Sequence, residues 1–369
     1  MAATAEHSKS AYQPAVHWLA VAVAAATFPL ICLGSEVTSR HAGMSVPDWP
    51  DSYGYNMFLF PRSRWIGGIF YEHTHRLAAT VVGMLSICLV IAAFWPRKDR
   101  SKNRANRILA LTVLGGVLFQ GILGGLRVLL VNLDLAIVHA CVAQAFFCLA
   151  ALAAIVSSRW WLRAPALSAT PQGPGGWRVA RWGIVTVAVV YAQLIIGAIM
   201  RHENAGLAIP DLPLAYGHLL PPTTAAGLAA ANHARIWIYN LPDRVTLAQI
   251  WLHFGHRLGA LAVTIAITSL VWLALRGRNK FRLQGVRGLA TLLAGLLVLQ
   301  ITLGVLTVLM RKPFEIASAH VATGALVLLT TFVLTARAIR LYHPRFADSP
   351  ADRQANAITA RETQELAPA

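Results

Sequence analysis

The segment that decides the fold is RHAGMSVPDWP at residues 40–50, because it recurs as RHENAGLAIPDLP at residues 201–213. Each copy follows a long apolar run. Further matching blocks occur in the same order in both halves: EHTHR (72–76) with HFGHR (253–257), GGVLFQGILGG (115–125) with GLLVLQITLG (295–304), and AIVHACVAQ (136–144) with IASAHVATG (316–324). Agreement across several blocks in one order indicates an internal duplication.

Apolar runs long enough to cross a hydrocarbon core of about 30 Å accompany these blocks. The chain is 56% hydrophobic and only 13% charged, whereas soluble domains are about a quarter charged. We therefore predict an all-α polytopic membrane protein whose eight transmembrane helices form two pseudo-symmetric four-helix bundles. The expected helices are 16–38, 71–95, 108–130, 135–156, 179–200, 249–275, 287–310 and 315–340.

The duplication also predicts how the chain is divided. We expect a cytoplasmic N-terminal tail, a first four-helix bundle, a Pro- and Gly-rich cytoplasmic linker, a second four-helix bundle, and a flexible cytoplasmic tail. These parts cover residues 1–15, 16–160, 161–178, 179–345 and 346–369, respectively.

The net charge of +17 reflects topology and indicates no nucleic-acid partner. Lys and Arg gather in alternate, short connections, and such loops stay cytoplasmic. Both termini are then predicted to be cytoplasmic, and the longer loops 39–70 and 201–248 to lie outside. The basic connections are 97–107, 159–181, 276–287 and 337–345.

Four histidines occupy equivalent positions in the two repeats. His75 and His139 are 64 residues apart, as are His256 and His320, and all four fall near the outer ends of predicted helices. Polar side chains in a bilayer are costly and usually functional. Two imidazoles from different helices suit the axial positions of a heme iron, whereas a zinc site generally needs three or four protein ligands.

The halves differ beside these histidines. Glu72 lies three residues before His75, on the same helix face, and His253 takes its place in the second half. A buried carboxyl group can act as an acid or a base, so the first half is predicted to perform chemistry. Arg76 and Arg257 follow the histidines; each could bind a heme propionate or extend to the membrane interface.

GSEVTSRHAGMSVPDWP (34–50), YEHTHR (71–76), the later histidines and the duplication resemble the heme A synthase family over residues 16–340. The resemblance implies an oxidoreductase that acts on a CH3 group of heme O. Two successive hydroxylations of a porphyrin methyl give a gem-diol, which loses water to leave the formyl group of heme A.

The resemblance also assigns roles to residues. His75 and His139 would flank the iron of the substrate heme, Glu72 would be the catalytic acidic residue beside the reacting methyl, and His256 and His320 would be the axial ligands of a heme b cofactor. It further implies handover from a heme O synthase, delivery to a terminal oxidase, contact with membrane lipid, and a place in the bacterial cytoplasmic (inner) membrane. It leaves open whether the chain forms a homo-oligomer.

The outer loops carry two departures of note. Many family members have a cysteine pair in an outer loop, but all four cysteines of this chain fall in predicted helices. A mechanism that relies on that pair is therefore not available. The long stretch 214–248 has no assigned role, although GLAAANHARIWIYNL (227–241) could form a helix at the membrane interface.

Two other functions compete with this interpretation. A b-type cytochrome that only transfers electrons would share the histidines, although hemes at one face do not span the membrane. A transporter with a proton relay would often show inverted repeats with polar residues at mid-membrane, whereas these repeats are parallel. A heme carrier without catalysis would not need Glu72.

Overall fold

The computed structural model describes residues 12–96, 104–164, 174–276 and 284–342. Within them, eight long helices are apolar enough to cross a membrane, which confirms the predicted all-α fold and the helix positions to within a few residues. They are α2 (Pro14–Ser39), α3 (Gly67–Phe94), α4 (Arg104–Leu129), α5 (Leu133–Val156), α7 (Pro174–His202), α9 (Leu247–Arg276), α10 (Gln284–Leu309) and α11 (Phe314–Tyr342).

Local signals explain where several helices begin. A proline opens α2, where its missing N–H has no helical partner to lose. The side chain of Asn132 accepts from the backbone N–H of Leu135 and caps α5. The helices are apolar around most of their circumference, and large side chains such as Leu118 and Phe119 are exposed on their outside. Such helices are stable in lipid rather than in water.

Each half forms a ring of four helices. In the first half, α2 packs against α3 and α5, and α4 also packs against α3 and α5. In the second half, α7 packs against α9 and α11, and α10 packs against the same two helices. Consequently α3 and α5 lie on one diagonal of their bundle, and α9 and α11 lie on the matching diagonal of theirs.

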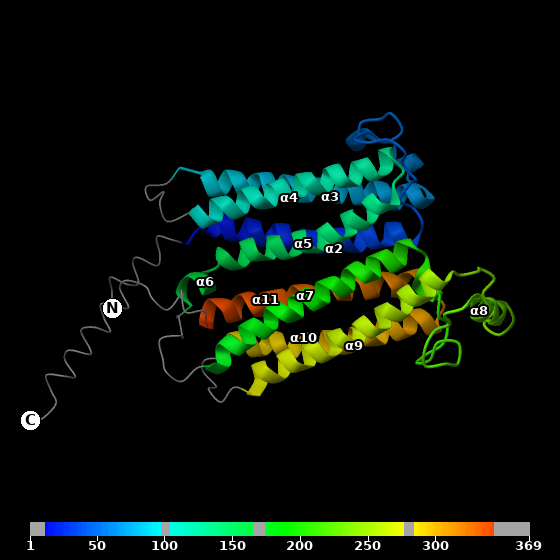
Figure 1. Ribbon diagram of the computed structural model, residues 1–369. Coiled ribbons are helices and arrows are strands. Elements are labelled where there is room, and N and C mark those ends of the chain that lie inside the picture. The colour runs from blue at the N-terminus through cyan, green and yellow to red at the C-terminus, as the bar shows by residue number, and fades with distance from the viewer. Residues whose placement is uncertain (1–11, 97–103, 165–173, 277–283, 343–369) are drawn as a thin grey trace, which may run out of the picture.

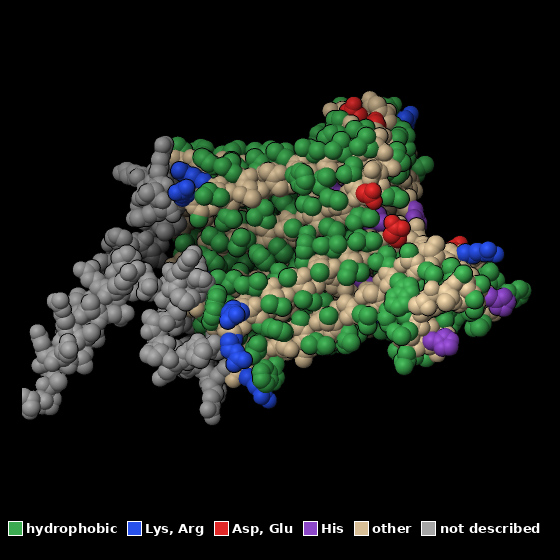
Figure 2. All heavy atoms as spheres, viewed as in Figure 1, with side chains coloured by type: hydrophobic (Ala, Val, Ile, Leu, Met, Phe, Trp, Pro, Cys, Tyr) green, Lys and Arg blue, Asp and Glu red, His purple; other side chains and the backbone are tan. Residues whose placement is uncertain are grey.

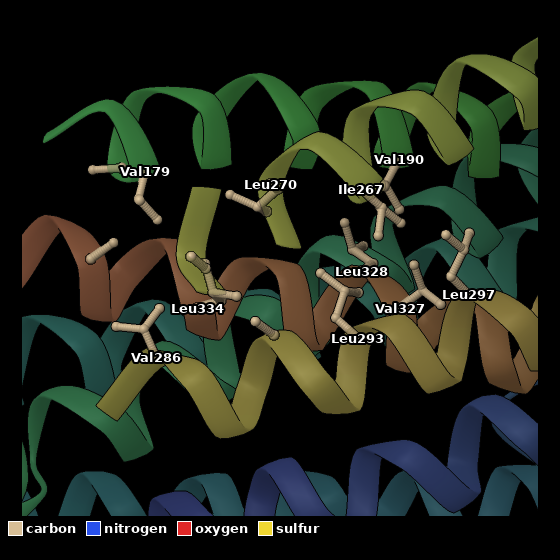
Figure 3. Close-up of a cluster of buried hydrophobic side chains, with 14 of the residues drawn as sticks. Val179, Val190, Ile267, Leu270, Val286, Leu293, Leu297, Val327, Leu328 and Leu334 are labelled. Carbon is tan, nitrogen blue, oxygen red and sulfur yellow. The ribbon is translucent and has the colours of Figure 1, made fainter. Parts of the chain in front are cut away.

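Each bundle has its own apolar core. The core of the first half includes Val23, Val82 and Val113, and the core of the second half is drawn in Figure 3, with Ile267 and Leu293 fully buried. Separate cores indicate that the duplication predicted from the repeats is structural.

The two bundles meet along α2 and α5 on one side and α7 and α11 on the other. At this seam, Ile31 of α2 and Phe147 of α5 are buried in one apolar cluster with Ala325 of α11. At its outer end, the guanidinium of Arg201 donates to Ser35 and Ser39. Apolar packing in mid-membrane and polar bonds toward the loops therefore hold the halves together.

The two ends of the molecule differ. The longer loops and α8 (Ala225–Trp237) lie at one end in Figure 1, and Lys and Arg side chains gather near the other in Figure 2. The helix expected at 227–241 is confirmed, and it begins two residues earlier. Smaller elements are η1 (Met57–Leu59), η2 (Arg62–Arg64), α6 (Arg159–Arg163) and η5 (Ala205–Leu207).

The predicted tails and linker lie partly outside the described residues, namely at 1–11, 165–173 and 343–369. Where the linker is described, α6 and the first turn of α7 extend helical structure into the range 161–178. All four cysteines are free and lie in helices, as expected.

Candidate functional site

The structure brings the predicted histidine pairs together. His75 on α3 and His139 on α5 lie near the loop end of the first bundle, on its diagonal, and their imidazoles are close enough to interact electrostatically. His256 on α9 and His320 on α11 form the corresponding pair in the second bundle. Each pair therefore approaches the interior of its bundle from two opposite helices.

A glycine on the neighbouring helix faces each of these histidines. A methyl group built on any of these glycines would come within 3.0–3.2 Å of the imidazole Cε1, so a larger residue would displace the ring. The pairs are Gly34 with His75, Gly124 with His139, Gly197 with His256, and Gly304 with His320. In three of these helices the glycine lies four residues after a glutamine. This repeated spacing could have indicated the glycine contacts, but we did not predict them from the sequence.

The side-chain amides of those glutamines contact the histidine residues on the adjacent helices. The Nε2 of Gln120 donates to the carbonyl of His139 at 3.2 Å, and the Nε2 of Gln193 donates to the carbonyl of His256 at 2.8 Å. The Nε2 of Gln300 lies 3.3 Å from the Nε2 of His320. These contacts fix the histidines from the side of the neighbouring helix.

Three of the four histidines have a buried ring nitrogen that makes no hydrogen bond. Within the described part of the chain, Nδ1 of His75, His139 and His320 is buried without a hydrogen-bond partner. A buried polar atom without a partner costs about 1–3 kcal/mol. Buried imidazole nitrogens without a partner, on helices that lie across the bundle from each other, fit a group that takes nitrogen ligands, such as heme iron.

The outer loops repeat in atomic detail. The carboxylate of Asp48 accepts from the backbone N–H groups of Tyr53 and Gly54, each at 2.8 Å. The carboxylate of Asp211 accepts from Tyr216 and Gly217 at 2.8 and 2.9 Å. The repeat thus continues beyond the PDWP and PDLP blocks to a Tyr-Gly pair five residues after each aspartate, which our sequence comparison missed.

The phenol of each tyrosine closes the same turn. The hydroxyl of Tyr53 donates to the carbonyl of Ser45, and that of Tyr216 donates to the carbonyl of Ala208. Both loops are therefore compact structures with a shared design, and each covers the loop end of its own bundle.

We expect the charged carboxylate of Asp48 to stabilise the first of these loops. Partial burial raises the pKa of this carboxyl, but the amides of Gly54 and Tyr53, with Arg76 nearby, outweigh burial and hold its pKa below the usual value. A lowered folded-state pKa means that the carboxylate stabilises the loop above its unfolded pKa and that this stability is lost as pH falls through the folded pKa.

Asp48→Ala should therefore increase hydrogen exchange at the amides of Tyr53 and Gly54 about tenfold, as two acceptor bonds are lost. Acidification of the unaltered protein through the folded pKa of Asp48 should lower the protection factors of the same two amides, once the slower intrinsic exchange at low pH is corrected for. Asp211→Ala is the matched control and should speed exchange at Tyr216 and Gly217 only. Equal exchange in Asp48→Ala and the unaltered protein would contradict the assignment.

Glu72 connects the first loop to the site. Its Oε2 accepts from the backbone N–H of Val46 at 2.9 Å, and its Oε1 accepts from the Nη2 of Arg76 at 3.0 Å. The residue is only 3% exposed. In the second half, the Nδ1 of His253 accepts from the backbone N–H of Ile209 at 3.2 Å. The glutamate and its replacement therefore receive the same loop amide, and only the glutamate brings a negative charge.

The two arginines that follow the histidines have loop carbonyls as partners. The guanidinium of Arg76 donates to the carbonyls of Val46, Asp48 and Asp51. That of Arg257 donates to the corresponding carbonyls of Ile209, Asp211 and Leu214. The structure thus shows them as anchors of the outer loops, and the predicted propionate contact stays a prediction.

The first site also has a distinct wall. The indole of Trp49 lies against Gly125 so closely that a side chain at Gly125 would collide with it. The repeat places Leu212 and Val305 at these positions. A bulky aromatic ring from the loop therefore covers α4 in the first half alone.

Other sites are not apparent in the part of the chain that the structure describes. No three His, Cys, Asp or Glu side chains there come together in a metal-binding arrangement. An apolar pocket of about 340 Å³ between the halves, lined by Leu152, Trp161 and Ile184 among others, lies at the end of the helices opposite the histidines.

Known proteins with similar sequences show the family to which this chain belongs. A family model described as "Cytochrome oxidase assembly protein" matches residues 66–333, which include Glu72 and all four histidines. The chain belongs to this family, which includes the heme A synthases. A heme A synthase from Bradyrhizobium sp. is 32% identical, covering 72% of this chain and 68% of that protein.

Other heme A synthases are similar over more of their length. The one from Shewanella oneidensis is 26% identical over 85% of this chain and 93% of that protein. The one from Caulobacter vibrioides is 26% identical over 90% and 97%, respectively. The resemblance to the heme A synthase family is confirmed, and the chain is a multi-pass membrane protein linked by its family to cytochrome oxidase assembly.

Proposed function

We propose that this chain converts heme O to heme A by oxidising a methyl substituent of the porphyrin to a formyl group. Membership of the family and the names of its relatives support this activity. The observation that carries it is the asymmetry between two otherwise matching sites. A buried carboxylate lies one helical turn from His75, and a histidine occupies that position in the second half.

The reaction sets requirements for the first site. Oxidation of a methyl to a formyl group removes four electrons: each of two hydroxylations takes up one water and releases two protons, with two electrons passed to an acceptor, and the resulting gem-diol loses water. Protons are released as the electrons leave, so a nearby base is needed. Glu72 is the acidic side chain closest to His75 along its helix, and either carboxylate oxygen can take a proton. His75 and His139 would hold the substrate by its iron.

We assign a heme b cofactor to His256 and His320. Their spacing, depth and glycine contacts match those of the first pair, and the unsatisfied Nδ1 of His320 fits an iron ligand. A bound heme b supplies a redox centre that can accept electrons. The lack of a carboxylate at the position of His253 suits a heme that is not itself modified.

The alternative functions have no comparable support. The relatives named above are heme A synthases. The family description adds a link to the assembly of cytochrome oxidase. We therefore propose that heme O comes from a heme O synthase, and that heme A passes to a terminal oxidase in the bacterial cytoplasmic membrane, with both termini of this chain in the cytoplasm.

The activity can be tested in cells that make heme O but lack a heme A synthase. Expression of this chain should produce a heme whose mass matches the formyl product, detected by extraction and mass spectrometry. Cells with an empty vector should contain heme O alone. If expressed, membrane-inserted protein produces no formyl heme, the proposed function is wrong.

A further inference from the structure

Arg127 is a cation beside the first histidine pair that the features described so far do not use. It lies on α4, three residues beyond the Gly124 that faces His139, which places it about 4.5 Å nearer the outer loops at about 1.5 Å per residue. Its Nη2 donates to the carbonyl of Gly43 at 2.7 Å. Its charge is within Coulombic range of both His75 and His139.

Arg127 has no carboxylate partner among the described residues. The ion pairs found there join Glu36 to Arg40 and Glu72 to Arg76. Glu72 is near enough to attract Arg127 electrostatically, but its two oxygens are already bonded to Val46 and Arg76. A guanidinium keeps its charge even when largely buried, and a buried charge is costly until an opposite charge meets it.

The second half lacks this arginine. Thr307 takes its place in the repeat, and its hydroxyl donates to the carbonyl of Leu303 in its own helix. Beside Gly206, the counterpart of Gly43, the nearest side chain is that of Lys312, from the connection between α10 and α11. An ammonium lacks the planar two-pronged geometry with which arginine binds carboxylates.

We propose that Arg127 binds a propionate carboxylate of the substrate heme and so orients the macrocycle in the first site. This proposal rests on the proposed function, because it takes His75 and His139 as the substrate site. The propionate edge then points toward the outer loops, and the apolar edge points toward the membrane interior, where charges are costly. Arg127 is thus a positioning residue that acts on the substrate away from its reacting methyl.

The test compares two probes, iron protoporphyrin and its dimethyl ester, in which both propionates are esterified and carry no charge. Each is titrated into the full-length protein in detergent, and heme absorbance is followed. The absorbance change that the unaltered protein shows and His139→Ala does not show is assigned to the first site. The unaltered protein should bind the free acid at least about tenfold more tightly than the ester, as expected for one charge-assisted hydrogen bond.

Arg127→Leu should remove this preference: the affinity for the free acid should fall about tenfold, and the affinity for the ester should stay unchanged. Arg127→Gln, which can still donate to Gly43, should give the same result if leucine disturbs folding. Arg127→Lys should keep part of the preference. Lys312→Met, which removes a positive charge from the second half, is the matched control and should keep all of it.

Two results would overturn the proposal. If Arg127→Leu and Arg127→Gln both lower the affinities for the free acid and the ester equally, the residue only supports the structure. An unchanged preference would mean that another group binds the propionate. If the unaltered protein shows no signal that depends on His139 with either probe, the substrate site itself is wrong, and the proposed function fails with it.

Discussion

Glu72→Gln is expected to lower the formation of heme A by at least about a hundredfold, the usual contribution of a general acid or base. Glutamine has nearly the same shape and can still accept from the backbone N–H of Val46, so the outer loop should keep its position. The amide cannot take a proton and carries no charge to pair with Arg76. The heme O to heme A ratio in extracted membranes, normalised to protein content, measures the effect.

Two variants serve as controls for Glu72. Glu36→Gln removes another carboxylate that pairs with an arginine four residues away, Arg40, and should leave the ratio unchanged. His253→Gln changes the equivalent position of the second half and should retain methyl oxidation to the extent that the second heme stays bound. Full conversion by Glu72→Gln would remove Glu72 from the catalytic role while leaving the family assignment intact.

His320→Ala is expected to remove most of the tightly bound heme b from the purified protein. A heme b held by His256 and His320 would lose one of its two protein ligands in this variant, and His256 alone would hold it more weakly. Alanine also leaves a cavity opposite Gly304, the residue that faces the ring. The reduced-minus-oxidised spectrum and the heme-to-protein ratio report the loss, and heme A formation should fall with it.

The first histidine pair provides the matched comparison. His139→Ala should keep the resident heme b and its spectrum, but should bind no porphyrin in the first half. His202→Ala is a further control, because its imidazole lies at the end of α7 and bonds to the carbonyl of Ala198. A His320→Ala protein with the same heme content as the unaltered protein would contradict the assignment of the cofactor site.

Much of the fold could be read from the sequence because a bilayer imposes simple requirements. A helix that crosses it must be apolar over about 20 residues, so eight such runs located, to within a few residues, the eight long apolar helices of the part of the chain that the structure describes. The repeated blocks, such as RHAGMSVPDWP and RHENAGLAIPDLP, identified the two halves. His75 and His139 could be paired with His256 and His320 because equal spacing in a repeat implies equal positions in space.

Other features escaped sequence reasoning because they depend on contacts between helices and loops. Hydropathy does not show that the histidine-bearing helices lie on the diagonals of their bundles, since every helix in lipid is apolar. The roles of Gly124 and Gln120 follow from which residue of the next helix they meet. For Arg76 and Arg257 the sequence left two roles open, a heme propionate contact or extension to the membrane interface, and their bonds to loop carbonyls appear only once the outer loops are folded.

The sequence by itself thus determined the class of protein, the duplication and the residue types at the two sites, because these depend on composition and spacing along one chain. Only the tertiary structure decided that Glu72 and His253 receive the same loop amide, and that Arg127 is left beside the first site without a carboxylate partner among the described residues. Hydrogen bonds and charge pairing depend on distances of a few ångströms between remote segments, which the order of residues does not state.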